Sequence, residues 1–349
     1  MVDETTGNRL AGTRIVSGKR TTIYDLAALA GASPSAVSSV LNGTWKKRRI
    51  SAALAERITR LADEHDFAIN MQASALRREK SNLIGMIVPK YDNRYFGLIV
   101  EQFEEMARAK GLFPIITCTR RDPDLEVQAA RAMISHQVDC LIATGATDPD
   151  RISELCASSG VRAMNLDLPG TLAPSVISDN YGGALVLTRR ILADSASSRP
   201  PGGPILFVGG RITDHSTSER LRGFRDAHAE AGIAIDETMV LTPGYAQEKA
   251  HLALKDYLAQ HDNAPKAIFV TSTITLEGVL HAIKESRLYD GLFPSIGCFD
   301  WDPLVAALDS RILMVRQDVP SMLKALFDLL EAAPGPPGIV SIPTLFDTP

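Results

Sequence analysis

Beyond residue 82 the chain alternates short apolar runs with stretches of helical periodicity, and this alternation limits the fold more than any other feature. One series begins at LIGMIV (83–88) and reaches CLIA (140–143), and a similar series runs from PILFVGG (204–210) to SIGCFD (295–300). Short apolar runs separated by helix-length segments are typical of βαβ units with buried parallel strands. The sequence therefore predicts an α/β body over residues 81–345, made of two similar lobes of parallel sheet flanked by helices.

Two facing lobes of this kind favour a ligand site between them. In open parallel sheets, small molecules bind beyond the carboxyl ends of the strands, so side chains that closely follow the apolar runs are the candidates. Carboxylates accept hydrogen bonds from hydroxyl groups, and a guanidinium group offers a planar set of donors. These residue types suit a polyhydroxylated ligand or an anionic oxygen. The candidate cleft residues are Arg94, Tyr95, Phe96, Asp179, Ser216, Arg220, Tyr245 and Asp300.

Several of these side chains also have an ordinary structural interpretation. Arg220 can form a surface ion pair on a helix, and Asp300 can be a solvated loop carboxylate. Tyr95 and Phe96 can belong to a packed interface. A further group of donors can bind a phosphate, namely Arg94, Arg211, Thr213 and Ser216. The sequence therefore leaves open whether the ligand is neutral or phosphorylated.

The first eighty residues differ from the rest of the chain in charge. They carry 13 basic and 8 acidic side chains, a net charge of +5, whereas the whole chain has a net charge of −4. A small basic module attached to an acidic body favours contact with a polyanion. An unevenly charged solvated surface explains the split equally well, so the helical pattern has to decide.

Residues 22–61 predict three short helices, the first two joined by a tight turn. Thr22 fits the N-cap of the first helix, and Gly31 ends it because glycine readily adopts a positive φ. Ser33 and Pro34 then fit the N-cap and first position of a second helix. A third helix that opens at Ser51 covers the apolar stripes of the other two. The pattern is that of a helix-turn-helix module, with a protein-docking three-helix bundle as the alternative.

The segment TIYDLAALAGASPSAVSSVLNG (22–43) resembles the DNA-binding headpiece of the lactose-repressor/galactose-repressor (LacI/GalR) family. The similarity continues through INMQASALRREKSNLIGMIVP (69–89) to about residue 345. It implies a helix-turn-helix headpiece over residues 21–68 and a hinge helix over residues 69–80. The remainder, 81–345, is then an effector-binding and dimerisation domain similar to the periplasmic sugar-binding proteins. Residues 1–20 show no periodicity, which predicts a mobile leader.

The resemblance also implies how the headpiece meets DNA. The second helix enters the major groove, and the basic run at residues 46–49 binds phosphates. Leu76 takes the place of a hinge leucine that wedges into the minor groove. The expected outer face of the second helix consists of Ser35, Ala36, Ser38 and Ser39. The residues expected to bind DNA are Thr22, Tyr24, Ser33, Pro34, Ser35, Ala36, Ser38, Ser39, Asn42, Lys46, Lys47, Arg48, Arg49, Ala73, Leu76 and Arg77.

Some positions depart from the family pattern. Ser39 stands where many relatives carry an arginine, so we expect weaker direct base readout and a larger contribution from DNA deformability. Ile69 stands where relatives commonly have a proline at the hinge entrance. Arg94 replaces a proline, and the pair Thr273 and Ile274 replaces an Asn-Asp pair in the cleft. The identity of the effector therefore does not follow from the resemblance.

Nothing in the sequence indicates catalysis, a metal or a cofactor. The chain contains no GxGxxG, GxxxxGK[ST] or HExxH motif, and its seven histidines do not cluster along the sequence. The four cysteines form no CxxC pair, which predicts reduced core thiols. No apolar stretch approaches the ~20 residues needed to cross a bilayer, and the N-terminal residues lack the pattern of a signal peptide. We expect a cytoplasmic protein that is not an enzyme and has no membrane contact.

A single recognition helix reads only a few base pairs, which predicts a homodimer on a palindromic operator. With the family resemblance, the sequence indicates a transcriptional regulator, interpreted as a repressor, whose operator affinity responds to a sugar or sugar-phosphate effector. The alternative is a cytoplasmic solute-binding protein or sugar enzyme with the same two-lobed body.

Overall fold

The computed structural model describes residues 21–67, 80–196, 205–289 and 293–346. These residues divide into two units with a boundary between Ser81 and Asn82. The predicted leader and all but the last residue of the predicted hinge helix lie outside the described residues. The expectations for Ile69, Ala73, Leu76 and Arg77 lie outside them as well.

The first unit is a three-helix headpiece whose helices begin where the sequence predicts. Its helices are α1 (Ile23–Ala30), α2 (Pro34–Leu41) and α3 (Ala52–Glu64). The Thr22 hydroxyl accepts a hydrogen bond from the Asp25 amide while the Asp25 carboxylate accepts one from the Thr22 amide, which completes the capping box. Gly31 ends α1 with φ +57°. Leu26, Val37 and Ile58, one from each helix, are fully buried at the centre.

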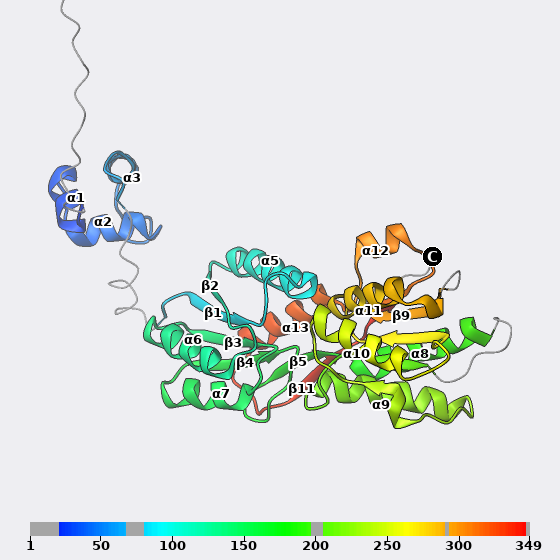
Figure 1. The fold of residues 1–349 in the computed structure, drawn as a ribbon. Coiled ribbons are helices and arrows are strands. Elements are labelled where there is room, and N and C mark those ends of the chain that lie inside the picture. The colour runs from blue at the N-terminus through cyan, green and yellow to red at the C-terminus, as the bar shows by residue number, and fades with distance from the viewer. Residues whose placement is uncertain (1–20, 68–79, 197–204, 290–292, 347–349) are drawn as a thin grey trace, which may run out of the picture. The chain divides into compact units, whose positions relative to one another are not determined.

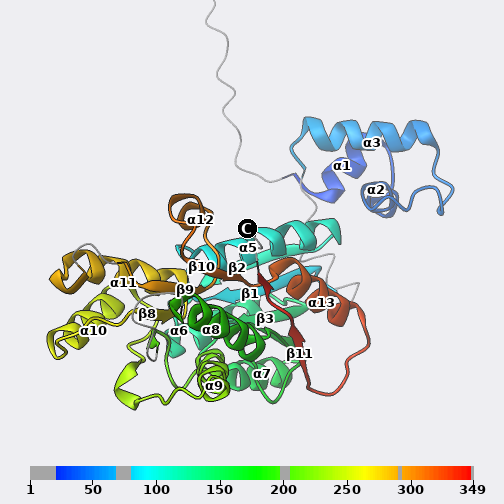
Figure 2. The ribbon, with the colours of Figure 1, turned by 90° about the vertical axis from the view of Figure 1, so that its right-hand side faces the viewer.

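The N-lobe of the second unit is a parallel sheet with helices on both faces (Figure 1). Its strands are β1 (Leu83–Val88), β2 (Phe113–Cys118), β3 (Cys140–Thr144), β4 (Arg162–Leu166), β5 (Ser175–Ser178) and β11 (Ile339–Ile342). Its helices are α5 (Arg94–Ala109), α6 (Pro123–Ser135), α7 (Pro149–Ser158) and α13 (Val319–Glu331). The strands lie in the order β11-β5-β4-β3-β1-β2. Figure 2 shows α5 beside α13, and these two helices pack on one face of the sheet while α6 and α7 cover the other.

The C-lobe repeats this arrangement. Its strands are β6 (Leu206–Val208), β7 (Val240–Leu241), β8 (Ala267–Val270), β9 (Ser295–Phe299), β10 (Leu313–Arg316) and β12 (Leu345–Phe346). Its helices are α8 (Asn180–Ala196), α9 (His215–Glu230), α10 (Gln247–Ala259), α11 (Thr273–Glu285) and α12 (Pro303–Leu308), with 3-10 turns at Glu237–Met239 and Arg287–Tyr289. The strand order β12-β10-β9-β8-β6-β7 matches that of the N-lobe. The predicted pair of similar lobes is therefore confirmed.

The chain passes between the lobes at three places. It crosses from β5 to α8, returns from β10 to α13, and crosses again between β11 and β12. The Pro-rich stretch APGPPG (333–338) followed by an apolar run predicts a turn and then one last strand over residues 339–345, and this prediction is wrong. The segment forms two short strands, and β12 pairs antiparallel with β10 in the other sheet. Pro343, which cannot donate a ladder hydrogen bond, lies between them.

In the described part of the chain, no helix combines the length and the apolar character required to span a membrane.

Candidate functional sites

A cavity of about 210 Å³ lies between the two lobes. In each lobe the chain order reverses beside the first strand, and at this topological switch point open parallel sheets bind their ligands. The volume is below the roughly 300–1,000 Å³ of pockets for drug-sized molecules, so the cavity suits a small ligand. Lining side chains that follow the carboxyl ends of strands are Tyr95, Arg121, Asp167, Arg211, Tyr245, Ser272, Asp300 and Gln317.

Two buried carboxylates face the cavity from opposite lobes. Asp300 follows β9, is 6% exposed, and accepts a hydrogen bond from the Gln317 side-chain amide. Asp167 follows β4 and accepts a hydrogen bond from the Tyr95 hydroxyl at 3.0 Å. Burial raises the pKa of both carboxyl groups, that of Asp300 to about 6. Both residues also adopt positive φ values, +113° for Asp300 and +75° for Asp167. Such strained backbone in non-glycine residues concentrates at functional sites.

Replacing Asp300 by asparagine is expected to raise the free energy of unfolding at neutral pH. Because the folded-state pKa is raised from 3.8 to about 6, the folded chain binds this proton more tightly than the unfolded chain. This tighter proton binding stabilises the folded chain fully below about pH 4. The stabilisation, about 3 kcal/mol of unfolding free energy, is lost as the pH rises through 6. Thermal melts should therefore give similar Tm values for the two proteins near pH 4 and a higher Tm for the variant at pH 7.5. Equal Tm values at pH 7.5 would show that the ionised Asp300 carboxylate does not destabilise the folded protein.

Arg220 lies in the wall of the cavity and is held on three sides. Its Nε donates to Asn180 Oδ1 at 2.8 Å, and its Nη1 donates to the carbonyl of Thr271. Its guanidinium carbon lies 3.7 Å from the centroid of the Phe299 ring. With 3% exposure, Arg220 is not the surface ion pair that the sequence left open as an alternative. The guanidinium is therefore fixed in orientation before any ligand arrives.

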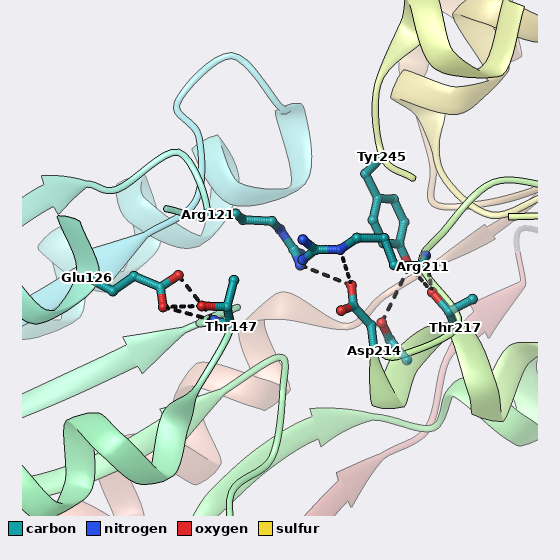
Figure 3. Close-up of polar contacts among 8 residues, drawn as sticks. Arg121, Glu126, Thr147, Arg211, Asp214, Thr217 and Tyr245 are labelled. Carbon is teal, nitrogen blue, oxygen red and sulfur yellow. Dashed lines mark hydrogen bonds and ion pairs between the residues drawn. The ribbon is translucent and has the colours of Figure 1, made fainter. Parts of the chain in front are cut away.

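An ion pair joins the lobes at the cavity wall (Figure 3). Arg121, which follows β2 in the N-lobe, reaches Asp214 at the start of α9 with Nη1 3.1 Å from Oδ2. Arg211 donates to the same oxygen at 3.2 Å, and the Arg121 guanidinium lies 5.3 Å from the centroid of the Tyr245 ring. The Tyr245 hydroxyl lies 2.9 Å from Thr217 Oγ1. Asp214 thus links a cation of the N-lobe to the C-lobe.

A second ion pair joins the lobes outside this cavity. Arg94 Nε, at the start of α5, lies 2.7 Å from an oxygen of Asp302, the N-cap residue of α12. Arg94 does not line this cavity, but it lines an adjoining cavity of about 690 Å³ that shares Tyr95, Asp300 and Gln317 with it. Asp179 is also outside the cavity, because its carboxylate accepts a hydrogen bond from the Gly182 amide at 2.8 Å in the first turn of α8. Thr213, expected near a phosphate, does not line the cavity either.

The structure does bring the other predicted cleft residues together. Tyr95, Phe96, Ser216, Arg220, Tyr245 and Asp300 all line the cavity. Phe96 also packs in the N-lobe core, so it serves both the cavity wall and the core of its lobe. Asp300 is buried and is not a solvated loop carboxylate.

Several cavity residues were missed by the sequence reasoning. Arg120, Arg121 and Asp167 follow strands directly, so the rule applied to other strand ends was sufficient to find them. Consecutive positive φ values, +56° at Arg120 and +55° at Arg121, shape the loop after β2. Lys249 gives no such signal, because it lies inside a helix.

In the headpiece, the structure corrects the placement of Ser39. Its side chain is 5% exposed, and its hydroxyl donates to the carbonyl of Ser35 at 2.8 Å, so it is not on the outer face of α2. Tyr24 is 72% exposed. The other predicted outer-face residues are exposed or half-buried, namely Ser35, Ala36 and Ser38, and the basic run of Lys46, Lys47, Arg48 and Arg49 is exposed.

Intramolecular hydrogen bonds also hold the predicted DNA-binding residues Thr22, Ser33 and Asn42. The Ser33 hydroxyl caps α2 by accepting the Ala36 amide at 3.2 Å, and Thr22 caps α1. The Asn42 side chain donates to the Ser38 carbonyl at 2.7 Å. These contacts fix the ends of the two helices of the helix-turn-helix and leave their polar side chains near the exposed face.

Known protein families match each of the two structural units. Residues 22–70 match the model described as bacterial regulatory proteins, lacI family, and residues 84–331 match the periplasmic binding protein domain. The ribitol operon repressor of Klebsiella aerogenes is 66% identical over 261 residues, which cover 75% of this chain and 97% of that protein. The sucrose operon repressor of Klebsiella pneumoniae is 30% identical over 313 residues, with 89% and 92% coverage.

Solved structures show the same fold. The lac repressor dimer bound to operator and an anti-inducer matches with a TM-score of 0.78 at 20% identity, covering 93% of this chain and 97% of that one. The Cra regulator of Pseudomonas putida in complex with fructose 1-phosphate matches with a TM-score of 0.66 at 21% identity, covering 76% and 98%. The chain belongs to the LacI family of bacterial regulatory proteins. It is a DNA-binding transcriptional regulator and not an enzyme, as predicted from the sequence.

Proposed function

We propose that this protein represses an operon for the use of ribitol or a related polyol. In the cytoplasm, its homodimer binds a palindromic operator and releases it when a small polyhydroxylated effector fills the cleft. The observation that carries the proposal is the buried set of Asp167, Asp300 and Arg220 at the switch point of two lobes joined to a DNA-binding headpiece. The 66% identity to a ribitol operon repressor supports a polyol as the substrate of the regulated operon.

The cavity chemistry suits adjacent hydroxyl groups. Each ionised carboxylate accepts hydrogen bonds from hydroxyls, and the fixed guanidinium of Arg220 offers donors to their oxygens. Tyr95 and Phe96 supply an apolar wall against carbon atoms. A ligand that makes these contacts replaces the solvation that Asp300 loses by burial.

A phosphorylated effector is the second candidate, and one observation favours it. Cationic side chains in the cavity wall outnumber the two carboxylates, and they are Lys90, Arg120, Arg121, Arg211, Arg220 and Lys249. Arginine and lysine side chains bind phosphate oxygens with charge-assisted hydrogen bonds. The related Cra regulator was solved with fructose 1-phosphate.

For the headpiece, we propose that α2 reads the major groove through Ser35, Ala36 and Ser38. Ser33, Pro34 and Tyr24 contact the DNA beside it, as does the basic run at residues 46–49, whose phosphate contacts carry no sequence information. Thr22, Asn42, Ala73, Leu76 and Arg77 remain proposed contacts, with Leu76 as the minor-groove wedge. Ser39 contributes through the shape of α2, because its hydroxyl is already bonded.

The test is effector-dependent release of a selected operator. An operator is first recovered from a pool of random palindromic duplexes, and its affinity is then measured by fluorescence anisotropy at several salt concentrations. Ribitol, the pentoses and ketopentoses related to it, and their monophosphates are added in turn, with a thermal shift recorded for each. We expect at least one compound to raise Tm and to weaken operator binding by about 5- to 150-fold.

A different result of this test would reject each part of the proposal. DNA binding that does not select a sequence and is insensitive to salt would reject the operator function. Selective operator binding with no response to any compound would reject the polyol effector alone. A monophosphate that binds at least tenfold more tightly than its parent polyol would establish the phosphorylated candidate.

A further inference from the structure

Two histidines and a glutamate lie together on α10 and α11, outside the lining of the cavity described above. The histidines do not cluster in the sequence, but in the fold the rings of His251 and His281 stack with centroids 4.5 Å apart. Glu285 lies four residues after His281 on α11, so the two side chains share one face of the helix. Figures 1 and 2 show α10 and α11 side by side. None of the three residues lines the effector cavity.

Close packing of the two helices holds this cluster on a rigid support. At Gly278 a Cβ atom would lie 2.1 Å from the carbonyl oxygen of Gln247 and 2.8 Å from the amide nitrogen of His251. Only glycine permits so close an approach of the two backbones. His251 therefore sits directly at the contact point of α10 with α11, and His281 follows Gly278 by about one turn. The positions of the ligand-bearing backbones are thus set by packing.

The spacing of the ligand atoms fits a tetrahedral metal ion. His251 Nε2 lies 3.0 Å from one carboxylate oxygen of Glu285, and His281 Nε2 lies 3.3 Å from the other. One ligand atom from each residue falls within 4.8 Å of both others. Ligand atoms bound to zinc at about 2.0–2.1 Å in tetrahedral geometry are roughly 3.3 Å apart. The cluster can therefore receive an ion with side-chain adjustments alone.

We propose that His251, His281 and Glu285 form a binding site for a divalent transition-metal ion of the zinc class, with water in the fourth position. Imidazole nitrogens with one carboxylate oxygen suit zinc, nickel or copper better than magnesium or calcium, which prefer oxygen ligands. The side chains of His281 and Glu285 are 51% and 41% exposed, so the ion can enter from solvent.

The local charges favour the metal-binding form of the carboxylate. Hydrogen bonds from His251 and Lys255 lower the pKa of Glu285, which keeps the group ionised at neutral pH. Lys255 Nζ lies 3.2 Å from the same oxygen as His251 and competes with an incoming cation. The Lys255 side chain is 58% exposed, so its ammonium group can move into solvent and release the Glu285 oxygen to the metal ion. Surface ion pairs of this kind contribute little to stability.

The bound ion would tie together two helices that begin at the effector cavity. Lys249 in the first turn of α10 and Ile274 in the first turn of α11 both line that cavity. A metal crosslink between the two helices stabilises the C-lobe in its folded form, because the unfolded chain lacks the assembled site. Metal binding should therefore raise the Tm of the protein even without an effector.

The test is zinc binding to the full-length, tag-free protein after treatment with a chelator. Titration calorimetry should give one site per chain, and Co²⁺ should produce the visible bands of a four-coordinate ion. His251→Ala and His281→Ala should each weaken zinc binding at least tenfold and remove both the Co²⁺ bands and the zinc-dependent rise in Tm. The matched control is His136→Ala, an exposed histidine at the end of α6, which should bind zinc like the unaltered protein.

The two histidine variants also show whether zinc binds at this site or elsewhere on the protein. Their circular dichroism spectra and operator binding should equal those of the unaltered protein, because neither side chain lines the cavity or belongs to the headpiece. Zinc binding that survives in both variants, or that is lost equally in His136→Ala, would overturn the site. Neither result bears on the effector. Operator release by the effector is measured separately, with a chelator present so that no metal is bound.

Discussion

Replacing Ile58 by alanine should abolish operator binding while the body still binds its effector. Ile58 is fully buried on α3, where it packs with Leu26 and Val37 at the centre of the headpiece. Truncating a buried isoleucine to alanine costs about 2–5 kcal/mol. A core as small as that of residues 21–67 rarely supplies more than about 3–5 kcal/mol, so the change should unfold most of the headpiece. The body has its own four core clusters and should remain folded.

The measurement combines operator anisotropy with a thermal shift for the effector. The matched control is Thr59→Ala, the next residue on α3, which is exposed and bonds only to a carbonyl of its own helix. This control should retain operator binding. An Ile58→Ala protein that binds operator with unchanged affinity would mean that the headpiece derives its stability from contacts outside its own core. Loss of the effector response as well would mean that the two units are not independently stable.

The elements that sequence reasoning predicted best are those whose signals are local. Thr22, Gly31 and Ser33 each have a conformational preference that depends on the adjacent residues, and all three end or begin helices as expected. The apolar runs of the two lobes also specify buried strands, because strands covered on both faces need apolar residues throughout. Local preference and tertiary packing agree in these segments.

Two errors arise where a polar side chain bonds to the backbone of its own helix instead of facing a ligand. Ser39 has a polar side chain at helical spacing from Ser35, but its hydroxyl bonds to that backbone carbonyl and turns away from the outer face. Asp179 follows a strand as the rule requires, yet it serves the first turn of α8 instead of the cavity. Its neighbour Asn180 is the residue that holds Arg220. Sequence position alone does not distinguish a helix-capping carboxylate from a ligand-binding one.

The final strand shows the same limit for topology. The apolar segment 339–345, which contains Pro343, was expected to form one strand, but β11 joins the N-lobe sheet and β12 the C-lobe sheet. The crossing puts a third connection between the lobes, beside those at residues 179 and 317. Gln317 at one crossing accepts a hydrogen bond from Ser178 and donates one to Asp300. The connection at residue 317 is therefore bonded to the carboxylate that lines the cavity, so we expect a ligand at Asp300 to influence the angle between the lobes through Gln317.

Replacing Arg220 by methionine should remove the effector response and leave operator binding intact. Methionine keeps much of the aliphatic length, but it offers no donors to a ligand and leaves Asn180 Oδ1 and the Thr271 carbonyl without their partner. An unsatisfied buried acceptor costs about 1–3 kcal/mol, so we expect a lower Tm as well as an effector affinity reduced by at least a hundredfold. Asp300 also loses a nearby cation that lowers its pKa, so this pKa should rise further and the stability of the variant should fall more steeply from pH 5 to 8 than that of the unaltered protein.

The control for this prediction is Arg225→Met on the same helix, whose exposed guanidinium pairs with Glu237. That variant should keep both the effector response and the operator affinity, because exposed ion pairs contribute little. Operator anisotropy with and without effector separates the two variants, and thermal melts at several pH values report the Asp300 effect. A folded Arg220→Met protein that still releases operator at the same effector concentration would show that the fixed guanidinium takes no part in ligand binding. In that case the donors to the ligand would come from other side chains of the cavity wall, such as Arg121 or Lys249, because the two carboxylates offer acceptors but no donors once ionised.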